Sequence, residues 1–467
     1  MEKETELFVQ SLMSKMTLKE KIGQLYEAIY YGSAVTGPEF ENSDCNKYLS
    51  QGLVGSILGQ YDNKNIYELQ KYAVEKTRLG IPLYFANDII HGCRTMFPIN
   101  LAMSCTWNPK LIMEASKVAG YEASKSGVNV VYSPMVDLVR DPRWGRVTES
   151  NGEDPYLSSV LTKAYIKGYQ RDDLKDNDAV ASCLKHYIGY GAISGGRDYN
   201  SVDMSIDTLF NYYLPPFASG VKQGSSQVMT SFNTFNGIPS TCNKYLLRDV
   251  LKGKLKFKGS VVSDYTSSVE IIKHKLAKDE KEVARKCIVA GLDHELVSTS
   301  YVDYLKELSN EDPRIIDYIN DSCKRILTLK KNLGLFENPY KAIHIDFEKY
   351  WLKDEFKKKS LEVAHESIVL LENRCLPLNN NEKVLFVGPF IDEQKVIGAW
   401  GGKSNINDTV TLLNALEKSS YKYATFKGCD IFDNLNIDGL NEKAQNIDKI
   451  VLVLGEDQWM SGENHSR

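Results

Sequence analysis

The sequence predicts an α/β protein: a TIM-like (β/α)8 barrel followed by a second, incomplete α/β domain. Three observations lead to this prediction. Short apolar runs alternate with longer helix-like stretches, several of these runs end in polar or charged side chains, and a second β/α series begins after a polar linker. Alternating strands and helices form parallel sheets, and polar residues at strand ends are typical of the active-site face of a barrel.

The length and composition are those of a soluble globular protein with more than one domain. At 467 residues the chain exceeds a single ordinary core. Hydrophobic residues make up 42% and charged residues 25%, and the formal net charge is −4. Because neither sign of charge dominates, we expect no nucleic-acid partner and no attraction to an anionic membrane.

From the sequence we expect no leader, membrane anchor or metal site. The N-terminal stretch is amphipathic and lacks the apolar core of a signal peptide, and no apolar run approaches the roughly 20 residues that cross a bilayer. The nine cysteines show no Cys-x-x-Cys spacing, and the seven histidines do not cluster with them. We therefore expect a cytoplasmic protein with reduced thiols and with no metal or other cofactor.

The first elements of the barrel are a capped helix and a series of strands. Thr17-Leu-Lys-Glu20 is a capping box, in which both side chains bond the first free backbone N–H groups, so it predicts a helix that starts near Thr17. Apolar runs then predict seven strands: Val54–Leu58, Pro82–Phe85, Val128–Tyr132, Val180–Leu184, Gln227–Thr230, Gly259–Val262 and Ala290–Leu296. No convincing eighth strand is found.

Three of these strands lead into residues whose side chains could take part in catalysis or substrate binding. The strand at Pro82–Phe85 is followed by Asp88, the strand at Val180–Leu184 by Lys185 and His186, and the strand at Gly259–Val262 by Asp264. A Rossmann sheet also binds ligands at strand ends, but no Gly-x-Gly-x-x-Gly follows any of these strands. The barrel is therefore the preferred interpretation, with these residues on its active-site face.

A second domain begins beyond a linker. We expect the barrel over residues 1–336, a linker and helix over 337–372, and the second domain over 373–467. Strands are predicted at Lys383–Val387, Tyr423–Lys427 and Lys449–Gly455, the last of them buried. Only twelve residues follow the last strand, so we expect either a truncated domain or one that a second chain completes.

Six segments, taken in order, resemble glycoside hydrolase family 3, in particular its periplasmic β-glucosidases. They are Lys15–Gln24, Asp88–Gly92, Asp141–Ser150, Lys185-His186, Gly196–Met204 and Val261–Tyr265. The order and spacing resemble the family from residue 10 to the end of the chain. The resemblance implies a barrel followed by an α/β sandwich, inside which this chain would stop.

A retaining glycosidase needs a carboxylate nucleophile and a carboxyl acid/base about 5 Å apart. The resemblance implies that Asp264 in Ser263-Asp264-Tyr265 is the nucleophile; by position alone it is equally a helix cap. The family's Ser-Gly-Glu loop implies Glu463 as the acid/base, and Glu456, directly after the last strand, is its rival. Both glutamates would otherwise lie in a solvated loop.

A different acid/base location is used by one branch of the family, the β-N-acetylglucosaminidases. These enzymes use a second histidine in the loop Lys-His-Phe-Pro-Gly-His-Gly. Here the loop reads Lys185-His-Tyr-Ile-Gly-Tyr190-Gly, so Tyr190 replaces that histidine. The resemblance therefore implies an acid/base in the second domain.

The sugar-binding residues are also carried over from the resemblance. Asp88 corresponds to the carboxylate that binds the 4- and 6-hydroxyls, and Arg146, Lys185 and His186 correspond to residues that bind the 2-, 3- and 4-hydroxyls. Further substrate contacts are implied for four residues, Met229, Phe232, Tyr265 and Trp400. The alternatives are structural: Arg146 paired with Asp141 or Glu149, His186 a buried core histidine, Trp400 a core residue beside a glycine turn, and Arg197–Asp198 an ion pair.

Together these features predict a retaining exo-β-glucosidase that acts on oligosaccharides or aryl β-glucosides. A β-xylosidase or α-arabinofuranosidase on the same scaffold is the nearest alternative, and Asp88 favours a sugar with a 6-hydroxyl. An inactive sugar-binding protein or one part of a split enzyme is the alternative from another class.

Overall fold

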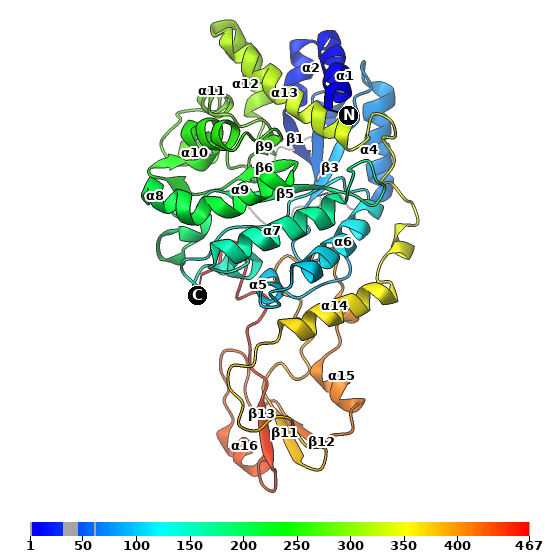
Figure 1. Cartoon of the computed structure of the whole chain (residues 1–467), viewed down its shortest axis with the longest axis vertical. Helices are drawn as coiled ribbons and strands as arrows, with labels where there is room; N and C mark the ends of the chain where they lie inside the picture. The colour runs from blue at the N-terminus through cyan, green and yellow to red at the C-terminus, as the bar shows by residue number, and fades with distance from the viewer. Residues whose placement is uncertain (1, 31–44, 60–61, 467) are drawn as a thin grey trace.

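The computed structural model describes residues 2–30, 45–59 and 62–466 and consists of a large helix-covered body and a smaller one below it (Figure 1). The large body is built around eight parallel strands in the order β10-β1-β2-β3-β4-β5-β6-β9. A single bridge between Val262 and His294 joins the two outer strands. The predicted (β/α)8 barrel is therefore confirmed as a nearly closed eight-stranded barrel.

The strands of the barrel are short and fully buried. Their bounds are β1 Tyr26–Ile29, β2 Ser56–Leu58, β3 Tyr84–Asn87, β4 Val130–Val131, β5 Ala181–Tyr187, β6 Gln227–Thr230, β9 Ser260–Val262 and β10 Glu295–Leu296. All seven predicted strands are present, and β1 is the one that the sequence pattern did not reveal. Glu27 interrupts its apolar run, but the hydroxyls of Tyr132 and Tyr84 donate to this buried carboxylate at 2.5 and 3.3 Å.

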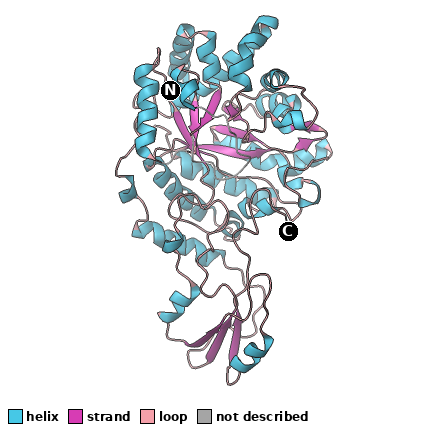
Figure 2. Cartoon of the chain, turned by 180° about the vertical axis from the view of Figure 1, so that it is seen from behind, coloured by secondary structure: helices cyan, strands magenta, loops and turns pink. Residues whose placement is uncertain are grey.

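Helices surround the barrel strands (Figure 2). The longer ones are α1 Glu2–Lys15, α4 Asn63–Lys76, α6 Pro109–Lys125, α7 Pro155–Gln170, α9 Leu214–Gln223, α11 Glu280–Ala290, α12 Ser300–Glu311 and α13 Arg314–Asn332. The shorter ones include α2 Leu18–Gly23, α3 Cys45–Ser50, α5 Asn100–Ser104, α8 Ile206–Thr208 and α10 Glu270–Lys273. The predicted capping box is present, with the Thr17 side chain accepting from the Glu20 N–H.

Local sequence explains where these helices start. Asn108, Asp154 and Asp279 each accept a bond from the backbone N–H three residues further on. Pro109 and Pro155 occupy the first helical position, where no N–H is needed. These caps set the entry points of α6, α7 and α11, so that the loops between strands and helices have defined ends.

The smaller body is a three-stranded parallel sheet in the order β12-β11-β13 (Figure 1). Its elements are β11 Lys383–Val387, α15 Leu412–Glu417, β12 Lys422–Phe426, α16 Ile437–Lys443 and β13 Lys449–Leu452, preceded by α14 Asp354–Ser367. The predicted strand at Lys449–Gly455 is present but ends at Leu452, and the expectation that it is buried is wrong. Ile450, Leu452 and Leu454 are exposed, because none of the described residues covers that side of the chain.

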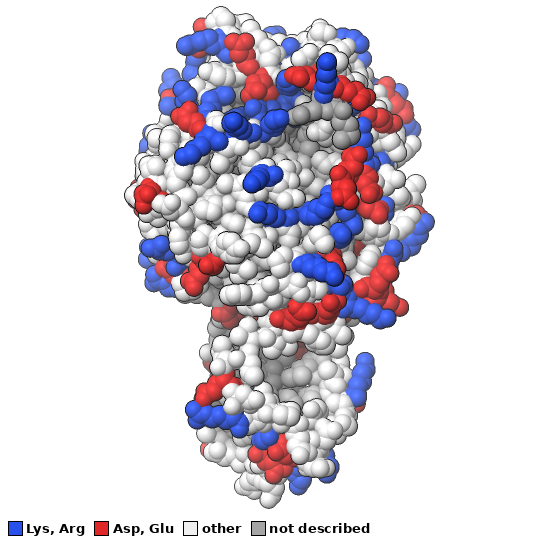
Figure 3. All heavy atoms as spheres, viewed as in Figure 1, with Lys and Arg blue, Asp and Glu red and all other residues white. Residues whose placement is uncertain are grey.

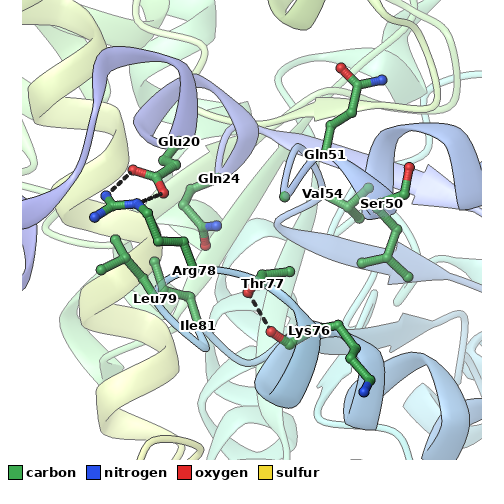
Figure 4. A pocket seen from close by; sticks show the side chains of 13 residues that line it. Glu20, Gln24, Ser50, Gln51, Val54, Lys76, Thr77, Arg78, Leu79 and Ile81 are labelled. Atoms are coloured by element: carbon green, nitrogen blue, oxygen red, sulfur yellow. Dashed lines mark hydrogen bonds and ion pairs between the residues drawn. The ribbon is translucent and has the colours of Figure 1, made fainter.

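The two ends of the barrel carry different groups of residues. At the N-terminal ends of the first strands, a cavity of about 140 Å³ is lined by residues that include Gln24, Val54 and Ile81 (Figure 4). The Arg78 guanidinium pairs there with Glu20 at 2.6 Å. Asp88 and Asp264 lie instead after the C-terminal ends of β3 and β9, and Lys185 lies in the C-terminal half of β5, which is the active-site face of such barrels.

On the face of the molecule seen in Figure 3, basic and acidic side chains are interspersed over both bodies. Within the described ranges, no helix combines the length and apolar character required to span a membrane.

Candidate active site

Lys185 and Asp88 form an ion pair at the C-terminal face of the barrel, across β4 from one another. Lys185 lies within β5, and Asp88 directly follows β3. The Lys185 Nζ atom lies 2.6 Å from Asp88 Oδ1, and the lysine side chain is almost completely buried. A buried ammonium group of this kind retains its charge because it faces a carboxylate.

His186 lies between two carboxylates. Its Nδ1 atom is 2.7 Å from Asp137 Oδ2, and its backbone N–H donates to the same oxygen at 2.9 Å. Its Nε2 atom is 3.5 Å from Asp264 Oδ2. Burial lowers the pKa of His186 well below its usual value, and the charges of Arg146 and Lys185 lower it further. The neutral ring is therefore favoured, and because Asp137 Oδ2 already accepts the backbone N–H of His186, we assign the ring proton to Nδ1.

Asp264 follows β9 and is 9% exposed. One carboxylate oxygen, Oδ1, accepts the backbone N–H of Tyr265 at 2.7 Å. The other, Oδ2, is buried and accepts no hydrogen bond from the residues that the structure describes. An ionised oxygen without a donor is poorly stabilised but strongly nucleophilic.

Arg146 is placed by the short 3₁₀ helix η1, Gly145–Glu149, and is 1% exposed. Its Nε and Nη2 atoms donate to the two carboxylate oxygens of Glu149 at 2.8 and 3.0 Å. The indole N–H of Trp400 donates to the same Glu149 at 2.8 Å, and the Trp400 ring lies 5.3 Å from Lys185 Nζ. Trp400 thus reaches the barrel site from the second body. Asp141 and Glu149 were the structural partners considered for Arg146, and Arg146 bonds to Glu149.

Glu463 approaches the same site from the loop after β13. Its Oε2 atom lies 3.9 Å from Arg146 Nη1, and its side chain is 9% exposed. The Tyr199 hydroxyl donates to its Oε1 atom at 2.6 Å. Glu456 is exposed. Of the two acid/base candidates, Glu463 is therefore the one that is buried beside Arg146.

The pKa values of Asp264 and Glu463 are linked. Burial and the Glu463 charge raise the pKa of Asp264, whereas Arg146 and Lys185 lower it. Burial also raises the pKa of Glu463, against the effects of Arg146 and Tyr199. Since the charge on Glu463 adds to the effect of burial in raising the pKa of Asp264, a proton on Glu463 favours ionisation of Asp264. One neutral and one ionised carboxyl is the arrangement required for acid-assisted displacement.

The remaining predicted substrate contacts lie around Asp264. Met229, at the end of β6, is 2% exposed and packs in the apolar cluster inside the barrel. Phe232 is 6% exposed, and its ring meets the Tyr199 ring edge-on at 5.0 Å. Tyr265 is half-buried and packs against the clusters on both sides. The substrate-contacting roles of these three residues stay predictions.

Four residues of this site were not identified from the sequence: Asp137, Glu149, Asp198 and Tyr199. Three of them lie inside the motifs that carry the resemblance, and Asp137 follows the strand at Val128–Tyr132. A search for every carboxylate after a predicted strand would have found Asp137. The expected Arg197–Asp198 ion pair is wrong: among the described residues, Asp198 bonds instead to Trp144, Tyr190 and Asn464.

Comparisons with known proteins identify the family of the chain. Residues 17–329 match the glycosyl hydrolase family 3 N-terminal domain, and residues 368–467 match the C-terminal domain of that family. A periplasmic β-glucosidase of Salmonella typhimurium is 35% identical over 99% of this chain and 64% of its own length. A putative β-xylosidase of Formosa agariphila is 31% identical over 97% of this chain and 63% of its own length.

A solved structure shares both bodies of the fold. The β-glucosidase of Listeria innocua in complex with isofagomine superimposes with a TM-score of 0.92 at 38% identity, covering 98% of this chain and 65% of that protein. The chain thus spans less than two thirds of the length of these relatives. Because the two family domains match most of the chain, it belongs to glycosyl hydrolase family 3.

Proposed function

We propose that the chain is the catalytic part of a retaining exo-β-glucosidase that removes terminal non-reducing β-D-glucosyl residues. One observation carries the proposal: Asp264 and Glu463, from different bodies of the fold, lie within the field of the same Arg146, and the charge of Glu463 raises the pKa of Asp264. The similarity to β-glucosidases supports the choice of sugar.

In the proposed first step, Asp264 Oδ2 attacks the anomeric carbon as the bond to the leaving oxygen breaks. Glu463 gives its proton to that oxygen, so that an alcohol or phenol leaves and a glucosyl ester remains on Asp264. In the second step, Glu463 takes a proton from water while the water oxygen attacks the anomeric carbon. Asp264 is released as a carboxylate, and glucose leaves with net retention of configuration.

The residues around the two carboxyls suit a sugar with several hydroxyl groups. In the proposal, residues 1–336 supply Asp88, Arg146, Lys185 and His186 as hydrogen-bonding groups for the sugar. Residues 373–467 supply Glu463 and Trp400, and 337–372 connect the two parts. Hydrogen bonds to sugar hydroxyls that strengthen as the ring becomes oxocarbenium-like would increase the rate as well as the affinity.

The first prediction tests the nucleophile. Incubation with 2,4-dinitrophenyl 2-deoxy-2-fluoro-β-glucoside should add one fluoroglucosyl group to a peptide that contains Asp264, measured by intact mass and peptide mapping. This leaving group needs little acid assistance, so the result does not depend on Glu463. Asp264→Ala should form no adduct and should lose about 10⁴-fold or more in turnover. Wild-type rates from Asp264→Ala would contradict the proposal.

A second candidate is a β-xylosidase or α-arabinofuranosidase, which the similarity to a putative β-xylosidase favours. Comparison of kcat/KM for p-nitrophenyl β-glucoside, β-xyloside and α-arabinofuranoside separates these activities. Preference for the glucoside is expected, because the Asp88 carboxylate and Lys185 form a charged pair suited to a 6-hydroxyl. If no substrate reacts and no adduct forms, an inactive sugar-binding or split protein becomes the better proposal.

A further inference from the structure

The segment Ser461–Ser466, here named the acid/base loop, is bonded to the barrel although it belongs to the second body. The Gly462 N–H donates to the Gly145 carbonyl at 2.7 Å, and the Gly145 N–H donates to the His465 carbonyl at 3.0 Å. Trp144 and Ser466 form an antiparallel bridge beside these bonds. The loop therefore lies against η1, which also places Arg146.

A second barrel loop, Gly196–Tyr199 after β5, holds the other side of the acid/base loop. The Ser466 hydroxyl donates to the Gly196 carbonyl at 3.0 Å, and the Asn464 N–H donates to Asp198 Oδ2 at 2.7 Å. The other carboxylate oxygen of Asp198 accepts the Trp144 indole N–H at 2.9 Å. Asp198 is thereby fixed on one side and holds the acid/base loop on the other.

Tyr199 contacts the Glu463 carboxyl itself. Its hydroxyl donates to Glu463 Oε1 at 2.6 Å, while its ring packs edge-on against Phe232. The backbone of Tyr199 has φ +63°, the left-handed region that a bulky aromatic residue rarely adopts. A conformation of this cost persists where surrounding contacts impose it, and such residues cluster at functional sites.

We propose that Asp198 and Tyr199 are the positioning residues of the acid/base. Asp198 fixes the backbone of the acid/base loop, and Tyr199 orients the Glu463 carboxyl and stabilises its ionised form. This inference rests on the proposed role of Glu463. Because the Tyr199 hydrogen bond stabilises the ionised carboxylate, it makes Glu463 a stronger acid toward the leaving oxygen. It also orients the Glu463 carboxyl so that its proton points toward that oxygen.

The test is Tyr199→Phe, which keeps the ring against Phe232 and removes only the hydroxyl. For phenyl β-glucoside, which needs its leaving oxygen protonated, kcat/KM should fall by roughly 10- to 100-fold. For 2,4-dinitrophenyl β-glucoside, kcat/KM should stay within about threefold. The basic limb of the kcat/KM profile for phenyl glucoside should move to higher pH, because loss of the donor raises the pKa of Glu463.

Tyr212→Phe is the matched control. The Tyr212 hydroxyl donates to the Glu153 carbonyl at 3.0 Å, so the variant loses one tyrosine hydrogen bond outside the site. It should retain the wild-type ratio of the two kcat/KM values and the wild-type pH profile. An equal loss on both substrates in Tyr199→Phe, or no loss and no pH shift, would overturn the role of Tyr199.

The role of Asp198 can be tested without measuring enzyme turnover. In Asp198→Ala, amide hydrogen exchange of peptides spanning residues 461–466 should be at least about tenfold faster than in the wild type, since the Asn464 N–H loses its acceptor. Unchanged exchange would refute the docking role. A wild type with protected amides but no adduct on Asp264 would overturn the proposed enzyme activity and, with it, the tuning role of Tyr199, while leaving Asp198 as a docking residue.

Discussion

Asp137 shows how a single buried carboxylate can act on the site through a neighbour. Its pKa is raised to about 8, mainly by burial, against the lowering effects of the His186 N–H and the charges of Arg146 and Lys185. Its Oδ2 atom accepts both the backbone N–H and Nδ1 of His186, which fixes the imidazole tautomer. The Nε2 lone pair is thereby turned toward Asp264 and the proposed sugar position.

Asp137→Asn should lower kcat/KM for p-nitrophenyl β-glucoside by at least about 10-fold, because an amide can donate to Nδ1 and reverse the tautomer. The substitution is nearly isosteric, so the melting temperature measured by calorimetry should change by only a few degrees. Activity within twofold of the wild type would show that the His186 tautomer is unimportant. Lys252→Arg, a conservative change in a structural ion pair with Asp293, serves as the control for general disturbance of buried charge.

Whether a site residue could be predicted depended on whether the family resemblance assigns a role to it. Asp264, Glu463 and Arg146 stand in motifs with an assigned role, so their proximity was anticipated. Tyr199 stands in such a motif without an assigned role, and its importance comes from a left-handed backbone that a sequence does not reveal. Contacts between residues that are more than 250 positions apart, such as Tyr199 with Glu463, have no local signal.

Among the elements, the helices and strands with strong local patterns were predicted and the weak ones were not. Strand β1 was missed because Tyr26–Ile29 follows α2 almost directly and contains Glu27. Strands β4 and β10 have only two residues each, so the longer predicted apolar runs are mostly loop or helix. Pairing with a buried neighbour, rather than residue propensity, defines such short strands.

The close approach of η1 to the acid/base loop predicts the effect of one methyl group. A Cβ atom on Gly145 would lie 2.4 Å from the carbonyl oxygens of Gly462 and His465. Gly145→Ala should displace the acid/base loop and lower kcat/KM for phenyl β-glucoside by roughly 100-fold. Gly455→Ala is the control, because its Cβ would meet only the Phe390 ring at 3.7 Å.

Labelling of Asp264 by the fluoroglucoside distinguishes a displaced loop from a misfolded barrel. Gly145→Ala should still form the adduct, since the barrel strands that carry Asp264 do not depend on the acid/base loop. A variant that keeps full activity on phenyl β-glucoside would show that the backbone contact is tolerant and that Glu463 is positioned by other means.

At the scale of the whole molecule, the two bodies differ in how completely they bury their apolar residues. The barrel strands are fully buried, whereas the second sheet leaves Ile450 and Leu452 exposed on β13 and Leu454 exposed just beyond it. The apolar run 368–371 is also exposed. The sequence predicted the strands of this sheet, but alternation alone did not tell which side of β13 would lack a covering layer.

This exposed apolar surface predicts association of the isolated chain. Sedimentation velocity should show an average mass that rises with protein concentration, because contiguous apolar patches promote self-contact. Replacement of Ile450, Leu452 and Leu454 together by Thr should reduce this rise while leaving labelling of Asp264 unchanged. Ile206→Thr, at an exposed position on α8, is the control. A wild type that stays monomeric at all concentrations would contradict the prediction.

Docking of the acid/base loop on the barrel also restricts the conformational entropy of the chain. The polypeptide leaves the barrel after α14, contacts it again through Trp400 and docks on it at Ser461–Ser466, so the second sheet lies in an excursion of the chain that is anchored to the barrel on both sides. If that excursion were a flexible tether, closing it would cost about 4 kcal/mol. The folded second sheet shortens the tether and raises the effective concentration of Glu463 at the barrel. The second body can thus contribute to catalysis through its stability, even where it touches no substrate.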